Sequence, residues 1–155
     1  MILSIPLQPK ILGLAVTRLW NGQPCPDTRL TASVSLSRAP EGLQIRVSMP
    51  RREDERLPDA PSGTRVANLW EYDVVEVFLV GPGHRYLEVE LGAGGHWLVL
   101  GFSEIRKRSN EYEVFEPRMT FSKNDREWTS EIVIPWQMIP KDVRALNAFV
   151  IAAGQ

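Results

Sequence analysis

Apolar and polar residues alternate along most of the chain with a period of two, which is typical of β-strands that bury one face. The clearest alternating segments, each followed by a turn or a loop, are residues 30–38, 43–49, 73–80, 85–91 and 96–102. Further strands are expected at residues 112–122, 127–136 and 147–153, and a first strand ends at residue 16 after a short extended arm. The segment 136–146 contains Pro140 and predicts one helical turn.

About eight or nine short strands at this spacing predict an all-β fold, an antiparallel β-sandwich of jelly-roll or immunoglobulin-like type. A chain of 155 residues has the length of one domain, so we expect a single domain over residues 1–155. The residues expected in the core are Val75, Val77, Leu79, Leu87, Val89, Leu91, Ile132 and Ile134. Residues 51–68 are expected to form a long surface loop, of a kind that is often functional, and the basic segment 103–110 a solvated connector.

The turns of the 73–102 segment determine which side chains share a face of the sheet. A turn centred on Gly83 places Glu76 directly opposite Glu90. A second turn, centred between residues 93 and 94, places Trp97 beside Glu90. The face is then expected to carry Glu76, Phe78, Tyr86, Glu88, Glu90 and Trp97. Like charges directly opposite each other destabilise a sheet, so this face needs an interaction that offsets them.

Two interpretations of this face are open. In the first, it is the solvated side of an ordinary sandwich, where glutamates are hydrated and aromatic residues raise the strand propensity. In the second, it is a binding site in which an aromatic ring stacks on a sugar and carboxylates accept hydrogen bonds from sugar hydroxyls. Trp70 lies where the long loop meets a strand, and it is the aromatic residue that such a site would use.

A family resemblance favours the second interpretation. The stretches "LWEYDVVEVFLV" (69–80), "YLEVEL" and "EWTSEIVIPW" resemble the family 9 carbohydrate-binding modules and the wider DOMON-like β-sandwich group. From "RLWNG" (18–22) to the chain end, the resemblance is greatest to an uncharacterised family typified by the human chromosome 4 open reading frame 33 protein.

The resemblance implies roles for two residues. In the sugar-binding modules, the tryptophan that matches Trp70 is one wall of an aromatic clamp, and the glutamate that matches Glu76 hydrogen-bonds sugar hydroxyls. Those modules carry basic and amide side chains where this chain has Glu88 and Glu90. Their second clamp tryptophan lies beyond the point that matches the end of this chain. We therefore expect a C-terminally truncated domain that lacks its last strand.

The function expected from these features is that of a noncatalytic ligand-binding or interaction domain. Its predicted ligand-binding residues are Trp70, Glu76, Tyr86, Glu88, Glu90 and Trp97, and no catalytic residue is expected. One alternative is a retaining glycoside hydrolase, because Glu76 and Glu90 could approach the required separation of about 5.5 Å. Such an enzyme needs a carboxyl with a raised pKa, and an open strand face is expected to offer little desolvation. The other alternative is a protein scaffold. His84 and His96 fall in turns and indicate no catalytic triad.

Composition narrows the range of partners. The net charge of −1 and the absence of a run of about 18 apolar residues predict no binding to nucleic acid and no membrane span. Cys25 is the single cysteine, so no intrachain disulfide can form, which suits a cytoplasmic location. The expected partner is a sugar or another polar small molecule, or a protein. No cofactor is expected, although the three glutamates could hold calcium, which takes six to eight oxygen ligands.

Overall fold

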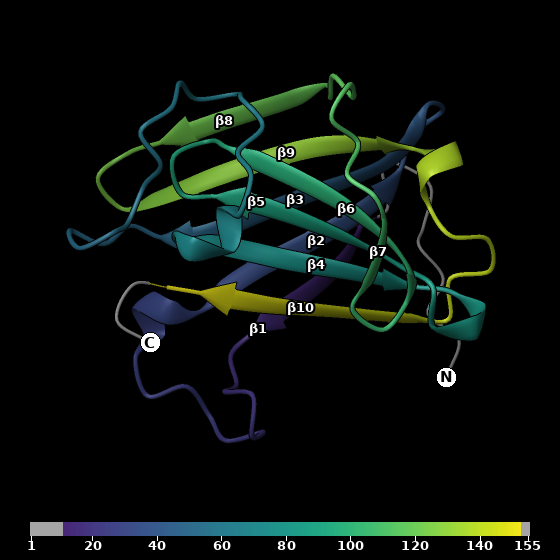
Figure 1. Cartoon of the computed structure of the whole chain (residues 1–155). Coiled ribbons are helices and arrows are strands. Elements are labelled where there is room, and N and C mark those ends of the chain that lie inside the picture. Colours follow the sequence, from purple (N-terminus) through teal and green to yellow (C-terminus); the bar gives the residue numbers. More distant parts are fainter. Residues whose placement is uncertain (1–10, 153–155) are drawn as a thin grey trace.

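The structure, a computed structural model, describes residues 11–152, and this range contains ten strands in two antiparallel sheets (Figure 1). The first sheet has the order β1 (Leu12–Val16), β2 (Ala32–Arg38), β3 (Gly42–Pro50), β9 (Glu127–Pro135) and β8 (Met119–Lys123). The second has the order β10 (Ala145–Ile151), β4 (Val74–Val80), β5 (Tyr86–Gly92), β6 (Trp97–Glu104) and β7 (Lys107–Asn110). The predicted all-β fold is confirmed.

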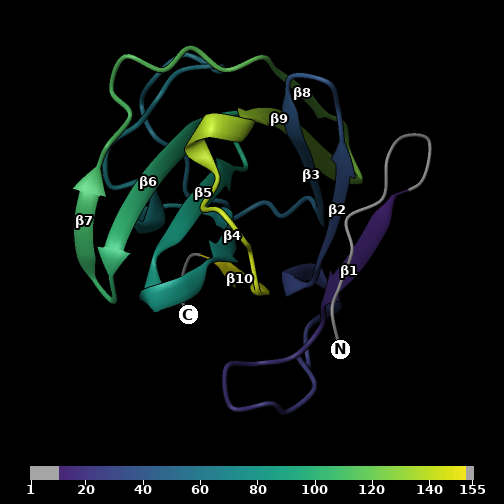
Figure 2. The same cartoon turned by 90° about the vertical axis from the view of Figure 1, so that its right-hand side faces the viewer.

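The two sheets face each other across one main hydrophobic core (Figure 2). All eight core residues predicted from the alternation are buried in it: Val75, Val77, Leu79, Leu87, Val89, Leu91, Ile132 and Ile134. Because side chains alternate along a strand, the intervening residues of β4 and β5 point to the outer face of the second sheet. The predicted division of these two strands into an aliphatic face and an acidic face is therefore correct.

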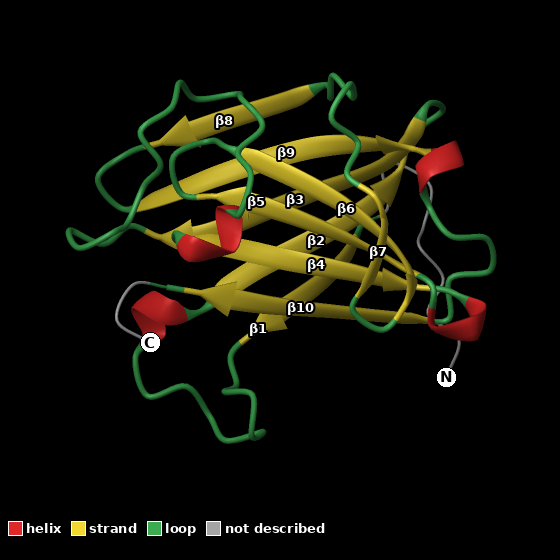
Figure 3. Ribbon diagram, viewed as in Figure 1, coloured by secondary structure: helices red, strands yellow, loops and turns green. Residues whose placement is uncertain are grey.

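Several predicted boundaries were wrong. The basic segment expected to be a loop contains β7, which pairs with β6 as the edge strand of the second sheet. The strand expected over residues 112–122 is shorter and begins only at Met119. The last strand, β10, begins at Ala145 rather than at residue 147, and part of the predicted span lies outside the described residues. The expected helical turn is the 3-10 turn η4 (Trp136–Met138), one of the short turns coloured red in Figure 3.

The outer face of the second sheet is partly covered by the long loop that precedes β4. This loop ends in the 3-10 turn η2 (Leu69–Glu71), which lies against β5 (Figures 1 and 2). Leu69 is fully buried there in a second hydrophobic cluster, with Val74, Leu98 and Leu100 of the sheet. The central strands β4 and β5 are consequently packed on both of their faces over part of their length.

A buried ion pair ties the long loop to the start of β4. The guanidinium of Arg52 lies 3.0 Å from the carboxylate of Asp73, and both side chains are at most 3% exposed. The other carboxylate oxygen of Asp73 accepts a hydrogen bond of 3.3 Å from the backbone N–H of Arg56. Arg52 also binds Asp54, whose side chain is 73% exposed. The loop is thus held at a buried point within the protein and is more than a surface connection.

The Arg52–Asp73 ion pair leads to a prediction about stability, and the exposed residue Asp54 provides its control. Asp73→Ala should lower the free energy of unfolding by about 3–5 kcal/mol, because it leaves the Arg52 charge buried without its partner. Asp54→Ala removes the exposed partner of the same guanidinium and should cost much less, because solvent screens an exposed ion pair. Urea unfolding of the two variants measures both values, and equal losses would show that the buried pair does not anchor the loop.

Candidate functional site

Three glutamates meet on the outer face of β4 and β5. Glu76 is paired directly with Glu90 across the two strands, and Phe78 is paired with Glu88. Carboxylate oxygens of Glu76, Glu88 and Glu90 all lie within 4.8 Å of one another. The predicted register is confirmed, and we call these three residues the glutamate trio.

Trp97 does not belong to this face, which corrects the sequence prediction. The β5–β6 hairpin pairs Trp97 with Leu91, so its side chain enters the main core and is 3% exposed. The turn is centred on Gly94 rather than half a residue earlier, because Gly95 adopts a positive φ of 80° and adds a residue to the loop. That half-residue error in the turn centre moved the predicted side chain to the wrong face.

The trio is much more buried than the outer face of a sandwich normally is. Glu90 is fully buried, Glu76 is 9% exposed, and Glu88 is half-buried. Burial, reinforced by the charge of Glu88, raises the pKa of Glu76 to about 7. Burial and the neighbouring Glu88 carboxyl raise the pKa of Glu90 far above its usual range. The expectation that this face offers little desolvation was therefore wrong.

Glu88 and Glu90 lie two residues apart on the same face of β5. Both oxygens of Glu90 are buried and accept no hydrogen bond from a donor group among the described residues. Burial also raises the pKa of Glu88, while the charge of Arg108 opposes this shift. Burial and the neighbouring Glu88 carboxyl hold the pKa of Glu90 far above its usual range, so Glu90 keeps its proton at neutral pH.

Arg108 of β7 connects the trio to Trp70. Its positive charge lowers the pKa of both Glu88 and Glu90, and its guanidinium lies 5.6 Å from the centre of the Trp70 ring. Trp70 itself belongs to η2 and is half-buried at the rim of the second hydrophobic cluster. The predicted neighbours Trp70 and the glutamates thus lie on the same side of the sheet. Sequence reasoning missed Arg108 because it treated residues 103–110 as a solvated loop.

Tyr86 lies on the same face but in a different environment. Its ring stacks on Phe102 with 4.3 Å between the centroids, and Phe78 lies 6.1 Å away. The Tyr86 hydroxyl accepts a hydrogen bond of 3.2 Å from the backbone N–H of Arg106. Phe149 of β10 extends this aromatic group, with its ring 5.8 Å from that of Phe78. Tyr86 therefore has a packing role that needs no ligand.

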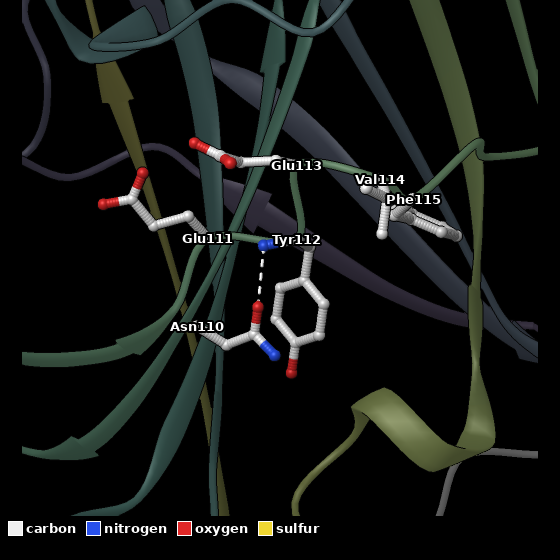
Figure 4. Close-up of a pocket in the computed structure, with 6 residues that line it drawn as sticks. All are labelled: Asn110, Glu111, Tyr112, Glu113, Val114 and Phe115. Atoms are coloured by element: carbon white, nitrogen blue, oxygen red, sulfur yellow. Dashed lines mark hydrogen bonds between the residues drawn. The ribbon is translucent and has the colours of Figure 1, made fainter.

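An open hollow of about 550 Å³ lies beside the site, along the segment that follows β7 (Figure 4). It is lined by Asn110, Glu111, Tyr112, Glu113, Val114 and Phe115, none of which was predicted as a site residue. The Asn110 side-chain oxygen accepts a hydrogen bond of 2.8 Å from the backbone N–H of Tyr112 and shapes this bend. Glu111 at its edge binds Arg108 at 2.9 Å, which places the hollow next to the trio's nearest cation.

The raised pKa values predict that the trio destabilises the fold as the pH rises. The unfolded chain releases these protons near pH 4.5, whereas the folded protein retains them to about pH 7 at Glu76 and to higher pH at Glu90. Each retained proton lowers the free energy of unfolding by about 1.4 kcal/mol per pH unit. Glu90→Gln should therefore gain stability over the wild type progressively from about pH 5 to pH 8.

Urea unfolding of both proteins across this pH range tests the prediction. Glu53→Gln, which changes an exposed carboxyl, should keep a constant difference from the wild type. A constant difference for Glu90→Gln as well would mean that Glu90 ionises normally in the folded protein.

Two comparisons, with protein-family models and with solved structures, found no match for the chain. No protein-family model matches the chain. No solved structure is significantly similar to it. The similarity to carbohydrate-binding modules thus stays a prediction.

In the part of the chain that the structure describes, no helix has the length and apolar character needed to cross a membrane.

The relatives that match share one name. The chain is 33% identical over 135 residues to the mouse UPF0462 protein C4orf33 homolog, covering 85% of this chain and 67% of the relative. It is 34% identical over 121 residues to the rat homolog, covering 76% of the chain and 59% of the relative. The human UPF0462 protein C4orf33 is 29% identical over 141 residues, or 90% of the chain and 69% of that protein. The chain belongs to the UPF0462 family.

Proposed function

We propose that the domain is a noncatalytic ligand-binding module, of carbohydrate-binding type, whose site is the trio and Trp70. The observation that carries this proposal is the position of the half-buried Trp70 ring beside a group of carboxyls, linked to them by Arg108. An indole surface offers stacking to the apolar face of a sugar ring, and carboxyls accept hydrogen bonds from its hydroxyls. A cytoplasmic location, suited to the single cysteine, is part of the same proposal.

The three glutamates of the trio would have different roles in binding a ligand. Glu88 is half-buried and is the member of the trio that is most exposed, so it is the acceptor that a ligand hydroxyl would meet. Glu76 has a pKa of about 7 and therefore offers either an acceptor or a donor near neutral pH. Glu90 is fully buried and acts behind Glu88, holding its carboxyl in place. Arg108 would shift its stacking when a ligand covers the same face of Trp70.

One observation favours a second function, that of a glycoside hydrolase. A glutamate with a pKa of about 7 suits a general acid near neutral pH. A retaining enzyme also needs an ionised carboxylate that reaches the sugar carbon. The opposite partner of Glu76 is Glu90, which is fully buried and neutral at that pH, so it cannot be this nucleophile. Noncatalytic binding is therefore the function we favour.

A panel of chromogenic glycosides tests the choice between binding and hydrolysis. We expect no release of the chromophore above the uncatalysed rate, because the face lacks an accessible nucleophile opposite Glu76. Turnover that Glu76→Gln abolishes, and that the exposed-site variant Glu53→Gln retains, would establish the hydrolase instead.

Binding itself is tested by titrating mono- and oligosaccharides while following tryptophan fluorescence. Trp70→Ala should weaken sugar binding by roughly 1–3 kcal/mol, because it removes the stacking surface. Its loss of stability should stay below the roughly 3–5 kcal/mol typical of a fully buried tryptophan, since Trp70 is only half-buried. Glu88→Gln should weaken binding by a similar amount while the melting temperature is kept.

Trp20 provides the matched control, because its side chain is 91% exposed and it lies in the segment between β1 and β2. Trp20→Ala should leave the affinity for the sugar unchanged. If no sugar in the panel gives a saturable change with the wild-type protein, the sugar proposal fails and protein scaffolding becomes the better account.

A further inference from the structure

The three carboxyl groups of the trio have no cationic partner in direct contact within the described part of the chain. Among residues 11–152, no ion pair within 4.0 Å involves Glu76, Glu88 or Glu90. The nearby cation Arg108 instead binds the Glu111 carboxylate at 2.9 Å and lies over the Trp70 ring. Three carboxyl groups thus share a largely buried space with only a distant positive charge.

A second observation concerns Glu90 alone. Its side chain is fully buried, and neither of its oxygens has a hydrogen-bond partner among the residues that the structure describes. Burying a polar group without a partner costs free energy, and a group of native residues that does so calls for a physical explanation. The side chain points to the face that Glu76 and Glu88 share, where both neighbours also lack a cationic partner. A cation bound between the three carboxyl groups would supply the partner that the Glu90 oxygens lack.

We propose that the trio binds a divalent cation of the size of calcium through Glu76, Glu88 and Glu90. Carboxylate oxygens are the ligands that hard cations prefer, and calcium accepts them singly or in pairs at about 2.3–2.6 Å. Oxygens bound to one such ion are at most about 4.6–5.2 Å apart, so carboxylate oxygens that already lie within 4.8 Å of one another can share a single ion. Magnesium demands regular octahedral geometry at about 2.0–2.1 Å and dehydrates reluctantly, so three side chains held at fixed backbone positions suit it less well than calcium.

The number of ligands is sufficient. Calcium binding must displace the proton of Glu90, and three carboxylates that then bind through both oxygens supply six ligands, the lower end of the range for calcium. Glu88 is half-buried, so water can complete the coordination from that side of the site. The paired strands β4 and β5 fix the three backbone positions, so the ligands need only rotamer adjustments to close on the ion.

The inference extends the proposed function, since the same carboxyls would serve a sugar and an ion. Calcium titrated in the absence of any sugar separates the two. Sugar binding without calcium binding would overturn the cation site alone, whereas calcium binding without sugar binding would overturn the sugar proposal alone.

Isothermal titration of calcium chloride into the full chain, at neutral pH and low ionic strength, is the direct experiment. We expect saturable binding to one site, and magnesium should bind at least tenfold more weakly. Glu90→Gln and Glu76→Gln should each reduce the calcium affinity at least tenfold. Glu53→Gln, with its exposed carboxyl elsewhere on the surface, should bind calcium like the wild type.

Circular dichroism and the melting temperature of each variant establish that it is folded before its affinity is compared. Calcium should also raise the melting temperature of the wild type, because an ion that binds only the folded state stabilises it. The proposal is overturned if the wild type shows no saturable binding at millimolar calcium. It is equally overturned if the folded Glu90→Gln and Glu76→Gln variants keep wild-type affinity.

Discussion

The burial of the central strands β4 and β5 on both faces is the constraint from which the character of this protein follows. In an antiparallel sandwich, the outer face is usually solvated and its charged residues are hydrated. Here Leu69 of η2 packs against Val74, Leu98 and Leu100 on that face. The Arg52–Asp73 pair holds the loop that delivers η2. Part of the outer face is therefore buried, and the glutamates beside this part are largely removed from solvent.

Carboxyl groups that lie together in such a setting cannot all ionise without a large cost in free energy. Burial keeps the proton on Glu90 at neutral pH and raises the pKa of Glu76 to about 7. Neither solution stabilises the fold at neutral pH as well as an apolar side chain would. Sequences that accept such a cost tend to do so at functional sites. This is the physical reason to look for a ligand here rather than at the hollow along residues 110–115, whose polar groups are exposed or already paired.

Much of the fold could be predicted because the period-two pattern is local information. Each core residue predicted in β4, β5 and β9 followed from alternation alone, as did the Glu76–Glu90 pairing. Trp97 failed because its face depends on the conformation of Gly95, whose positive φ shifts the register. The strand β7 failed because the exposed edge residues 107–110 carry no apolar alternation, and only their pairing with β6 makes them a strand. The alternation of apolar and polar residues predicts which face of the sheet a side chain occupies. It does not predict which other segments pack on that face.

That distinction explains why only part of the candidate site could be predicted from the sequence. Alternation placed the three glutamates together, but it could not show that η2 packs on the same face, because the contacts of Leu69 with Leu98 and Leu100 exist only in the folded protein. Arg108 matters for the same reason: its link to Trp70 and to Glu88 and Glu90 exists only in three dimensions. A β-sandwich as such hosts many unrelated functions. In this one, the burial of Glu76 and Glu90 beside η2 is what distinguishes their chemistry from that of hydrated surface glutamates.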